Sequence, residues 1–481
     1  MRVGIVGAGF SGIATAIALR RQGIEDFTVF EAGPELGGVW SKNTYPGAAC
    51  DVPSYAYSFS YAQRKDWSRP CSPQPEILDY LKATAAGHGV ADRIRLDCEV
   101  AGATFDDDAL RWTLTLADGE TYECDVLAIA CGQLSRPSWP RIEGAEAFAG
   151  HSFHSAEWDH GYDLRGKRVA VIGTGASAIQ FVPAIAPEVA ELQVYQRSAP
   201  WLLPRRNPEY PGFVKAAVQA VPGLQRLRRL GILTFMESCV TALTQVRALQ
   251  LALRTWSATF MRMQLRDPQV RRRAWPDYEI GCKRILFSSA YLPALQRENV
   301  ELVSEPIERL TAGGVVAGGR ERPVDCVIYG TGFKANEFVL PMQVSGREGR
   351  SLQDTWSEGA EAHLGLTVAG FPNMFLLYGP NTNLGIGSII VMIEAQVGYV
   401  VDALRRLRDS GAAALDVRPE VQRASGAALQ ARLKDSVWTH CHNWYTREDT
   451  GRVVNNWPGY MAEYVRATRA LVPAEYDWLP R

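Results

Sequence analysis

The sequence predicts an α/β protein with two Rossmann-like dinucleotide-binding domains and a helical insertion in the second of them. Three observations lead to this class: two glycine-rich loops that each follow an apolar strand, a regular alternation of short strands with helical patterns, and a run of long helices near residues 207–275. Alternating strands and helices are typical of mostly parallel sheets covered by helices. A chain of 481 residues can bury a separate core in each of several domains.

Two similar units are expected, each made of a strand, a glycine-rich loop, a helix and a second strand. Their elements are a strand over 2–6, a helix over 12–22 and a strand over 27–30 in the first unit, and a strand over 167–172, a helix from about 176 and a strand over 191–196 in the second. Further strands are expected over 124–130 and 324–329. Such units bind a dinucleotide at the loop between the first strand and the helix.

The first loop has the G-x-G-x-x-G pattern of a pyrophosphate-binding turn. Gly7 is expected to form the turn, Gly9 to allow close approach of the pyrophosphate, and Gly12 to let the helix pack against the strand. Glu31 follows the next strand, where a carboxylate accepts hydrogen bonds from ribose hydroxyls. Because the loop lies near residue 1 and Gly38 follows soon after Glu31, the pattern favours FAD over NAD.

The second loop, with Gly173, Gly175 and Ser177, precedes a strand that ends in Arg197 and Ser198. A cation stands here where the first unit has Glu31. An arginine can pair with the 2′-phosphate of NADPH, which a carboxylate would repel. The second unit is therefore expected to bind NADPH rather than NADH. The alternative is an arginine on a solvated strand end.

The domains are expected to be discontinuous in sequence, because the chain returns to the first domain after the second is complete. Gly330, Thr331 and Gly332 follow a strand and mark this return. The expected division is an FAD-binding domain at 1–140 and 326–481, an NADPH-binding domain at 141–206 and 276–325, and a helical insertion at 207–275.

Charge and cysteine content narrow the partners and the compartment. With 51 basic and 52 acidic residues, a net charge of −1 gives no argument for nucleic acid, so small molecules are the expected partners of a monomer or homo-oligomer. Nine scattered cysteines without a C-x-x-C pair indicate reduced thiols in a cytoplasmic protein rather than a disulfide framework, and argue against a disulfide oxidoreductase. The histidines show no metal-ligand spacing, and no metal is expected.

No membrane span is expected. The most apolar stretch, near 231–260, is interrupted by charged residues such as Glu237 and Arg254 and reads as an amphipathic helical pair. Peripheral membrane contact of this pair remains an alternative. The chain starts directly with a strand, a pattern that no cleavable signal peptide fits.

Three further motifs resemble one known family. Phe148, Gly150, His154 and Trp158, followed by Asp159, match the fingerprint F-x-G-x-x-x-H-x-x-x-W-P/D of the Type I Baeyer–Villiger monooxygenases. The segment from Gly38 and Trp40 through Tyr45 to Asp51 is similar to a second motif of that family, near its flavin. The segment Gly281–Arg284 is similar to a third, which supplies an active-site arginine and a neighbouring lysine.

The resemblance implies an enzyme that uses FAD, NADPH and O2 to insert oxygen next to a ketone carbonyl, giving an ester or lactone through a flavin C4a-peroxide. It implies that Arg284 and Asp51 are the catalytic pair and that Lys283 contacts NADPH. A loop containing Asn383 and Leu384 would lie against the flavin ring. The aromatic segment 441–459 resembles the 4-hydroxyacetophenone-monooxygenase-like branch.

For His154 the resemblance implies a place in the interdomain linker, where it would couple cofactor binding to domain movement. Two alternatives stay open for this histidine. Its ordinary pKa near neutrality would suit direct proton transfer, and simple packing would require no chemistry.

A fixed guanidinium also has a physical reason to be in such a site. At about 4 Å and an effective dielectric near 20 it stabilises an anion by roughly 4 kcal/mol. A carboxylate such as that of Asp51 can hold the planar group in position, and the same cation can stabilise the oxyanion of a tetrahedral adduct. The alternative is that Asp51 and Arg284 are separate surface charges.

Two alternative functions remain open. One is a flavin monooxygenase that oxygenates nitrogen or sulfur, which Trp158 disfavours because such relatives usually have another residue there. The other is a non-catalytic NADP sensor, which would need nucleotide contacts but no pair such as Asp51 and Arg284.

Overall fold

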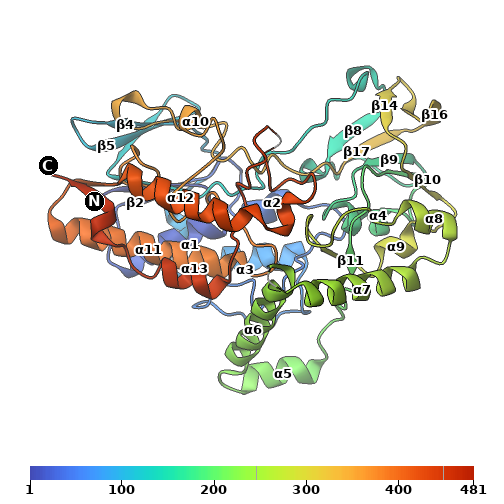
Figure 1. Cartoon of the computed structure of the whole chain (residues 1–481), viewed down its shortest axis with the longest axis horizontal. Helices are drawn as coiled ribbons and strands as arrows, with labels where there is room; N and C mark the ends of the chain where they lie inside the picture. Colours follow the sequence, from blue (N-terminus) through green and yellow to red (C-terminus); the bar gives the residue numbers. More distant parts are fainter. Residues whose placement is uncertain (245, 448, 481) are drawn as a thin grey trace.

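The computed structural model describes residues 1–244, 246–447 and 449–480. Two lobes, each built on a parallel sheet, lie side by side, and a helical hairpin projects from their junction (Figure 1). The two termini lie close together on the first lobe. The expected α/β class with two Rossmann-like parallel sheets is confirmed.

The first lobe is a five-stranded parallel sheet in the order β19-β7-β1-β2-β3. Its strands are β1 (Val3–Val6), β2 (Phe27–Phe30), β3 (Ile94–Arg95), β7 (Val126–Ile129) and β19 (Met374–Leu376). Alternate residues of β7 enter different cores: Val126 and Ala128 pack with the helices, whereas Leu127 and Ile129 pack with a four-stranded sheet. The strands are therefore buried on both faces, which explains why they are apolar without alternation.

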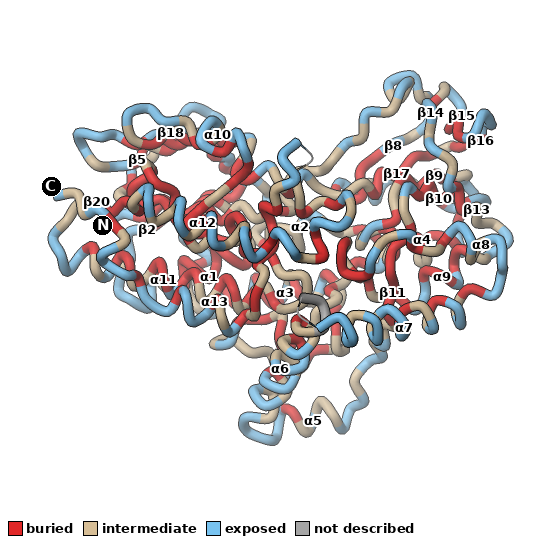
Figure 2. The backbone as a smooth tube through the Cα atoms, viewed as in Figure 1, coloured by how far each residue is buried: buried red, intermediate tan, exposed pale blue. Residues whose placement is uncertain are grey.

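Helices cover one face of this sheet and strands cover the other. The sheet between these two layers is buried (Figure 2). The helices of this lobe are α1 (Phe10–Arg21), α2 (Val39–Lys42), α3 (Gln74–Gly87), α10 (Leu352–Thr355), α11 (Ile389–Ser410), α12 (Pro419–Lys434) and α13 (Met461–Ala467). The four-stranded sheet is β4 (Val100–Asp106), β5 (Arg111–Leu116), β6 (Thr121–Cys124) and β18 (Gln343–Ser345), and β20 (Ala414–Val417) pairs with β21 (Tyr476–Leu479).

The second lobe repeats the plan with a parallel sheet in the order β13-β10-β9-β17-β8. Its strands are β8 (His151–His154), β9 (Arg168–Ile172), β10 (Glu191–Tyr195), β13 (Val300–Val303) and β17 (Cys326–Tyr329). The flanking elements are α4 (Ala178–Ile185), α9 (Tyr291–Ala294), β11 (Leu202–Leu203), β12 (Leu286–Phe287), β14 (Ile307–Leu310), β15 (Gly314–Ala317) and β16 (Arg320–Pro323).

Strand β17 pairs with β9 and β8, so it belongs to the second lobe. The return to the first lobe thus follows Tyr329 rather than beginning at residue 326. Near this point Phe333 forms a bridge with Pro137 of the outgoing segment. Both crossings between the lobes therefore run side by side.

The expected insertion at 207–275 consists of α5 (Gly212–Ala220), α6 (Leu224–Thr244), α7 (Arg247–Gln264) and α8 (Pro268–Arg273). It packs on both lobes and not only on the second. Arg229 of α6 is buried and donates to the carbonyl oxygens of Tyr55 and Ser58 in the first lobe, at 2.9 and 2.7 Å. In α7, Ser257 Oγ donates to Leu202 O of the second lobe at 2.8 Å. No helix in the described part of the chain is long and apolar enough to cross a membrane.

The expectation that all nine cysteines are reduced thiols is wrong for two of them. Cys282 and Cys441 form a disulfide, with their Cα atoms 6.1 Å apart. The two residues are separated by 159 positions in sequence. Only the tertiary fold brings them together, so their spacing in sequence gave no sign of the bond.

Candidate active site

The first glycine loop forms the narrow junction that a pyrophosphate requires. A Cβ on Gly12 would lie 1.8 Å from the carbonyl oxygen of Gly7, so no larger residue fits between the strand and α1. Gly9 faces Gly38 across the loop: a Cβ on Gly9 would be 3.6 Å from the Gly38 Cα. No side chain of the described residues caps the first turn of α1. The loop thus presents backbone amides at a helix N-terminus, as an anion site needs.

Glu31 directly follows β2 and is buried beneath this loop. Its Oε2 accepts from Ala8 N at 2.8 Å, and its Oε1 accepts from Gly33 N at 2.9 Å. The carboxylate therefore fixes the loop itself. Each oxygen keeps a second lone pair that a ribose hydroxyl can use.

The segment from Trp40 to Asp51 connects the first loop to the second lobe. Trp40 Nε1 donates to Tyr57 OH at 3.2 Å. Gln180 of α4 holds the other end of the segment: its Nε2 donates to Ala49 O at 2.9 Å and its Oε1 accepts from Ala49 N at 3.2 Å. These bonds orient the backbone immediately before Asp51 toward the second lobe.

Asp51 and Arg284 meet at the junction of the two lobes. Arg284 Nη2 lies 2.8 Å from Asp51 Oδ1 and 2.7 Å from Oδ2, although 233 positions separate the residues in sequence. The side chain of Asp51 is 18% exposed and that of Arg284 is 38% exposed. The carboxylate of Asp51 raises the pKa of Arg284 above its ordinary value, so this cation is permanent. The two residues are therefore an ion pair and not separate surface charges.

Two tyrosines lie near this pair: Tyr445, which belongs to the aromatic segment 441–459, and Tyr378, which the sequence analysis missed. Burial raises the pKa of both Tyr378 and Tyr445, and the charge of Arg284 opposes the rise. Both phenols are thus neutral hydroxyl groups. Tyr378 OH donates to Asn383 Oδ1 at 2.7 Å, which links the pair to the loop predicted to contact flavin. Tyr378 lies in no motif, and no sequence pattern placed Tyr445 beside Arg284, so only the fold could show that both tyrosines face the pair.

Asn383 is held from three sides, and its neighbour Leu384 packs in a small apolar core. The Asn383 Nδ2 donates to Asn456 Oδ1 at 2.7 Å, and its backbone N donates to Asn455 O at 2.9 Å. Leu384 lies against a cluster that contains Met392 and Trp457. The loop is therefore rigid, and the aromatic segment near Trp457 supports it from behind.

The second loop has a more open surface. A Cβ on Gly175 would have no atom within 4 Å, and no side chain of the described residues caps α4, which follows Ser177. Gly173 precedes Gly175 directly after β9. Space and free amides are therefore present where a second pyrophosphate is expected.

Lys283 and Arg197 form a cluster of like charge beside this loop. Lys283 Nζ donates to Ser198 Oγ at 2.8 Å and lies 4.7 Å from the ring centre of Tyr278. Burial, followed by the charge of Arg197, lowers the pKa of Lys283. Two neighbouring cations, one of them partly desolvated, favour a bound anion such as a phosphate.

The fingerprint residues lie at and beside β8, the edge strand of the second-lobe sheet, where His154 meets both crossings between the lobes. A Cβ on Gly150 would lie 2.5 Å from a ring atom of Phe148, so this glycine lets the ring pack against the backbone. Trp158 packs with Phe153 and Phe181, at ring distances of 5.1 and 5.3 Å, and contacts Tyr45 of the first lobe at 6.5 Å.

His154 lies at the end of β8, fully buried beside both crossings. Its ring is 5.5 Å from that of Trp139 and 6.0 Å from that of Phe333. Its Nδ1 accepts from Ala156 N at 3.1 Å, and burial lowers its pKa to about 4. The ring is thus neutral at physiological pH and holds the backbone of the linker.

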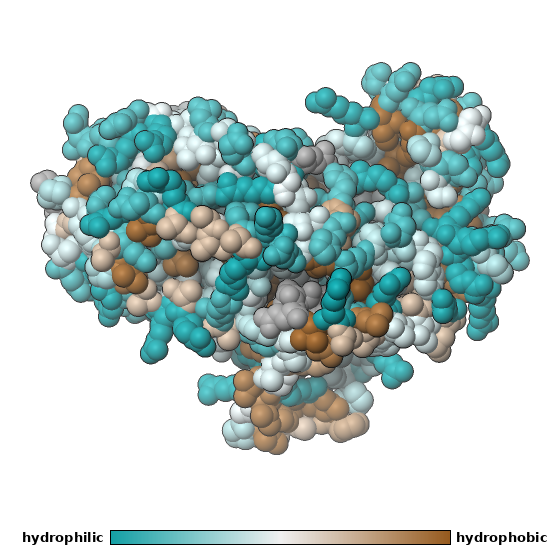
Figure 3. All heavy atoms as spheres, viewed as in Figure 1, coloured by the Kyte–Doolittle hydropathy of each residue, from teal (hydrophilic) through white to brown (hydrophobic). Residues whose placement is uncertain are grey.

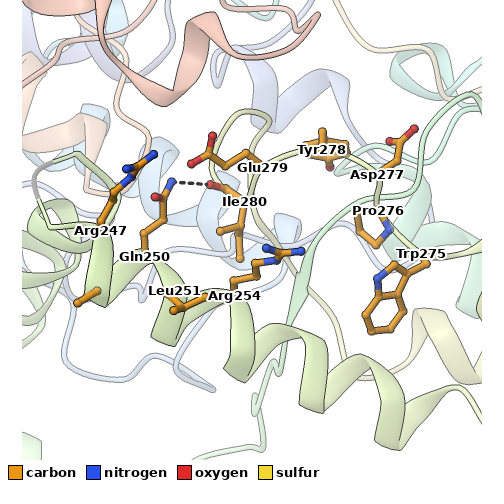
Figure 4. A pocket seen from close by; sticks show the side chains of 11 residues that line it. Arg247, Gln250, Leu251, Arg254, Trp275, Pro276, Asp277, Tyr278, Glu279 and Ile280 are labelled. Atoms are coloured by element: carbon orange, nitrogen blue, oxygen red, sulfur yellow. Dashed lines mark hydrogen bonds between the residues drawn. The ribbon is translucent and has the colours of Figure 1, made fainter.

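A cavity of about 830 Å³ opens next to the Lys283 cluster (Figure 4). Arg247, Leu251 and Arg254 of α7 form one side, and Trp275 and Tyr278 belong to the other. Gln250 Nε2 spans the two sides with a 3.4 Å bond to Ile280 O. Tyr278 also contacts Lys283, so the cavity borders the expected nucleotide site.

Comparisons with known proteins agree with this geometry. A family profile described as pyridine nucleotide-disulphide oxidoreductase matches residues 4–245. A Baeyer–Villiger monooxygenase of Pseudomonas aeruginosa is 43% identical, over 99% of this chain and 91% of that protein. An oxidised steroid monooxygenase bound to NADP is 30% identical, with a TM-score of 0.88 over 100% of this chain and 99% of that one. The structure of OTEMO with FAD and NADP is 27% identical, with a TM-score of 0.88 and 97% of both chains covered.

Proposed function

This chain belongs to the family of Baeyer–Villiger monooxygenases, and on that premise we propose which of its residues bind the cofactors and carry the reaction. It is an FAD-containing, NADPH-dependent enzyme that uses O2 to insert one oxygen atom next to a ketone carbonyl, giving an ester or a lactone. One observation supports the proposed roles above all others: the ion pair of Asp51 and Arg284 at the junction of the lobes.

In our proposal FAD is held by the first loop. Gly7, Gly9 and Gly12 would leave room for its pyrophosphate, Glu31 would accept from its ribose, and Gly38 would close the cradle that Gly9 begins. The loop fits this group because side chains are absent where the two glycines face each other. Trp40, Asn383 and Leu384 would bound the rest of the FAD site.

NADPH would bind the second loop, where Gly173, Gly175 and Ser177 present the N-terminus of α4. Arg197 and Lys283 would pair with the 2′-phosphate, with Ser198 as an additional hydrogen-bonding group. The lowered pKa of Lys283 supports this role, because a bound phosphate would relieve the unfavourable burial of its charge.

The bound flavin supplies hydride acceptance from NADPH and activation of O2. Arg284 is proposed to stabilise the negative charge that develops on oxygen as the ketone is attacked and converted. At about 4 Å and an effective dielectric near 20 this is worth roughly 4 kcal/mol, or nearly three decades in rate. Asp51 would keep the guanidinium in place, and the neutral hydroxyls of Tyr378 and Tyr445 would line the site.

His154 is proposed to act in the linker together with Phe148, Gly150 and Trp158. Its low pKa and its backbone contact support a structural coupling of the crossings rather than proton transfer. We also propose the domain division given above, with the return crossing moved to Gly330–Phe333. The assignment to the 4-hydroxyacetophenone-monooxygenase-like branch stays a prediction.

We further propose a cytoplasmic location and a monomer or homo-oligomer, with a small-molecule ketone and O2 as substrates. Seven of the nine cysteines are free thiols, which supports a reducing compartment, and the Cys282–Cys441 disulfide is the exception to this pattern. Each lobe has its own apolar core, so the chain can be stable as a monomer. Cell fractionation and light scattering of the purified protein test these two points.

The experiment that tests the assignment compares Arg284→Ala with Arg284→Lys in the purified holoenzyme. Anaerobic stopped-flow spectroscopy measures flavin reduction by NADPH, and gas chromatography measures the ester. Arg284→Ala should reduce flavin at close to the wild-type rate but form ester about 1,000-fold more slowly. Arg284→Lys should recover part of the loss, because it restores charge without the planar group.

Equal loss of both steps in Arg284→Ala would show that the residue serves binding or folding instead. A panel of ketones, amines and sulfides completes the test. Turnover of amines or sulfides alone would assign the chain to heteroatom oxygenation.

A further inference from the structure

The helical hairpin formed by α5, α6 and α7 carries an unusual share of the exposed apolar surface. Ten of the fifteen large apolar side chains that are exposed in the described part of the chain lie between residues 213 and 263, about a tenth of the sequence. Phe213, Leu227, Leu230 and Phe235 are 62–76% exposed, and Met263 is 72% exposed. Phe213 belongs to α5, and Leu227, Leu230 and Phe235 belong to α6. An apolar patch covers the end of the hairpin that projects furthest from the lobes (Figure 3). Contiguous patches of this kind mark an interaction surface.

The outward face of α6 is fixed because its inward face is anchored. The Arg229 Nη2 lies 3.6 Å from Glu394 Oε2, in addition to its bonds to backbone carbonyls. Two turns further on, Met236 is buried, and Glu237 accepts from Ala462 N at 2.7 Å. Leu227, Leu230 and Phe235 therefore point away from the lobes as a consequence of the fold.

The same hairpin is strongly basic in a chain that is otherwise acidic. Residues 212–264 contain seven Lys or Arg and a single acidic residue, Glu237, for a net charge of +6. The whole chain carries −1, so the remainder carries −7. Arg226, Arg247, Arg254 and Arg262 are exposed beside the apolar side chains. Basic side chains flanking an exposed apolar face are the pattern of helices that lie in an anionic membrane interface.

We propose that this hairpin docks the enzyme on an anionic lipid surface, with Phe213, Leu227, Leu230 and Phe235 inserted among the lipid headgroups. A second copy of the chain fits less well. A two-fold interface would place two surfaces of the same positive charge against each other, and like charges across an interface are unfavourable. An anionic lipid surface instead complements the charge and accepts the apolar side chains together.

Docking here also indicates the class of substrate, and this step rests on the proposed function. The cavity beside Lys283 is lined by Arg247, Leu251 and Arg254 of α7, the same helix that carries part of the patch. Its other side combines the aromatic rings of Trp275 and Tyr278 with the carboxylates of Asp277 and Glu279, so the lining is aromatic and charged together. The cavity borders Lys283, which directly precedes the proposed catalytic Arg284 in sequence, so a ketone held in the bilayer would approach the catalytic residue from this side of the hairpin. The preferred substrates are apolar ketones that partition into membranes, such as long-chain or polycyclic ones.

The test measures lipid binding and catalysis separately in the full-length holoenzyme. Co-sedimentation uses vesicles of phosphatidylcholine, with and without phosphatidylglycerol. Wild type should bind the anionic vesicles at least tenfold more tightly than the neutral ones, and added salt should weaken binding. The triple variant Leu227→Ser, Leu230→Ser, Phe235→Ser should lose at least tenfold in binding, and Arg226→Gln with Arg262→Gln should lose the preference for anionic lipid.

A matched control replaces three exposed apolar residues elsewhere, as Leu96→Ser, Val465→Ser and Val472→Ser, and should bind like wild type. Circular dichroism verifies that each variant is folded. Equal binding of wild type and the hairpin triple variant would overturn the proposal. So would concentration-dependent dimerisation, measured by light scattering, that the hairpin variant alone abolishes, since a second copy would then cover the patch.

Activity is then measured with two ketones. The hairpin triple variant should oxidise a short water-soluble ketone like wild type, and should be slower only with a long-chain ketone embedded in vesicles. If the wild type bound vesicles but oxidised neither ketone, the proposed function would fail while lipid docking stood. If the wild type and the hairpin triple variant oxidised the embedded ketone equally well, the proposed substrate class would be wrong.

Discussion

Lys283 and Arg284 are neighbours in sequence, yet the structure gives them opposite electrostatic surroundings. Arg284 faces Asp51, and its pKa is raised. Lys283 faces Arg197 and a tyrosine ring, and its pKa is lowered by burial and by that like charge. Arg284 already has a counter-ion, so it can stabilise negative charge that appears during a reaction. Lys283 lies beside another cation instead, so it favours a bound anion. Two adjacent residues can thus divide catalysis and cofactor recognition between them.

Among the variants that keep Arg284 itself, the largest expected effect on the rate comes from removing its counter-ion. Asp51→Asn keeps the size of the side chain but removes its charge, so the guanidinium is no longer fixed. Ester formation should fall about 100-fold, equivalent to roughly 3 kcal/mol, as measured by product analysis at saturating NADPH. Asp163→Asn, in an exposed pair with Arg165, is the matched control and should leave the rate unchanged. A wild-type rate in Asp51→Asn would show that the pair has no role in the reaction.

Next in size is the disulfide that joins the lysine–arginine segment to residue 441. Cys441→Ser removes a cross-link between distant parts of the chain and should lower the free energy of unfolding by about 2–4 kcal/mol. Guanidinium unfolding without reductant measures the difference. Cys239→Ser, at a free and half-buried thiol, is the control and should change little. If dithiothreitol leaves the stability of the wild type unaltered, the bond does not form in solution.

A smaller effect is expected for Lys283, the residue of the two that we propose binds the cofactor. Lys283→Ala should raise the KM for NADPH about tenfold, close to the value of one charge-assisted hydrogen bond. The KM for NADH should change little, because NADH lacks the 2′-phosphate. Lys334→Ala removes an exposed lysine that pairs with Glu337 and serves as the control. A similar rise for both cofactors would place Lys283 away from the phosphate.

The smallest effect is a shift with pH. Binding of the phosphate needs the charged form of Lys283, and a lowered pKa means that this charge is lost at a lower pH as pH rises. The KM for NADPH should therefore increase on the alkaline side before an ordinary lysine would titrate. Lys283→Arg, whose charge persists, should flatten that limb of the profile. An unchanged profile in Lys283→Arg would assign the dependence to another group.

Local pattern was enough to predict much of the fold. Each dinucleotide unit is a short run of sequence whose glycines, strands and helix are contiguous, so periodicity and spacing predicted both units. α1 begins at Phe10, only two residues before the expected start. The expected pairing of Asp51 with Arg284 also agrees with the structure, but it came from the resemblance of two motifs and not from spacing.

Features that depend on distant contacts were not predictable in this way. The Cys282–Cys441 bond, the tyrosines near Arg284 and the anchoring of α6 by Arg229 all join segments more than 90 positions apart. Strand β17 was placed at the wrong side of a domain boundary because an apolar strand looks the same in either sheet. Its neighbours in the sheet, and not its residues, decide its domain.

Because α6 is attached to one lobe through Arg229 and α7 to the other through Ser257, the angle between these two helices depends on how the lobes are oriented. A rotation of one lobe against the other would therefore change the angle between α6 and α7. A pair of fluorescent dyes, one on each helix, would convert that change into energy transfer, and nucleotide-driven motion of the whole enzyme could then be followed in real time.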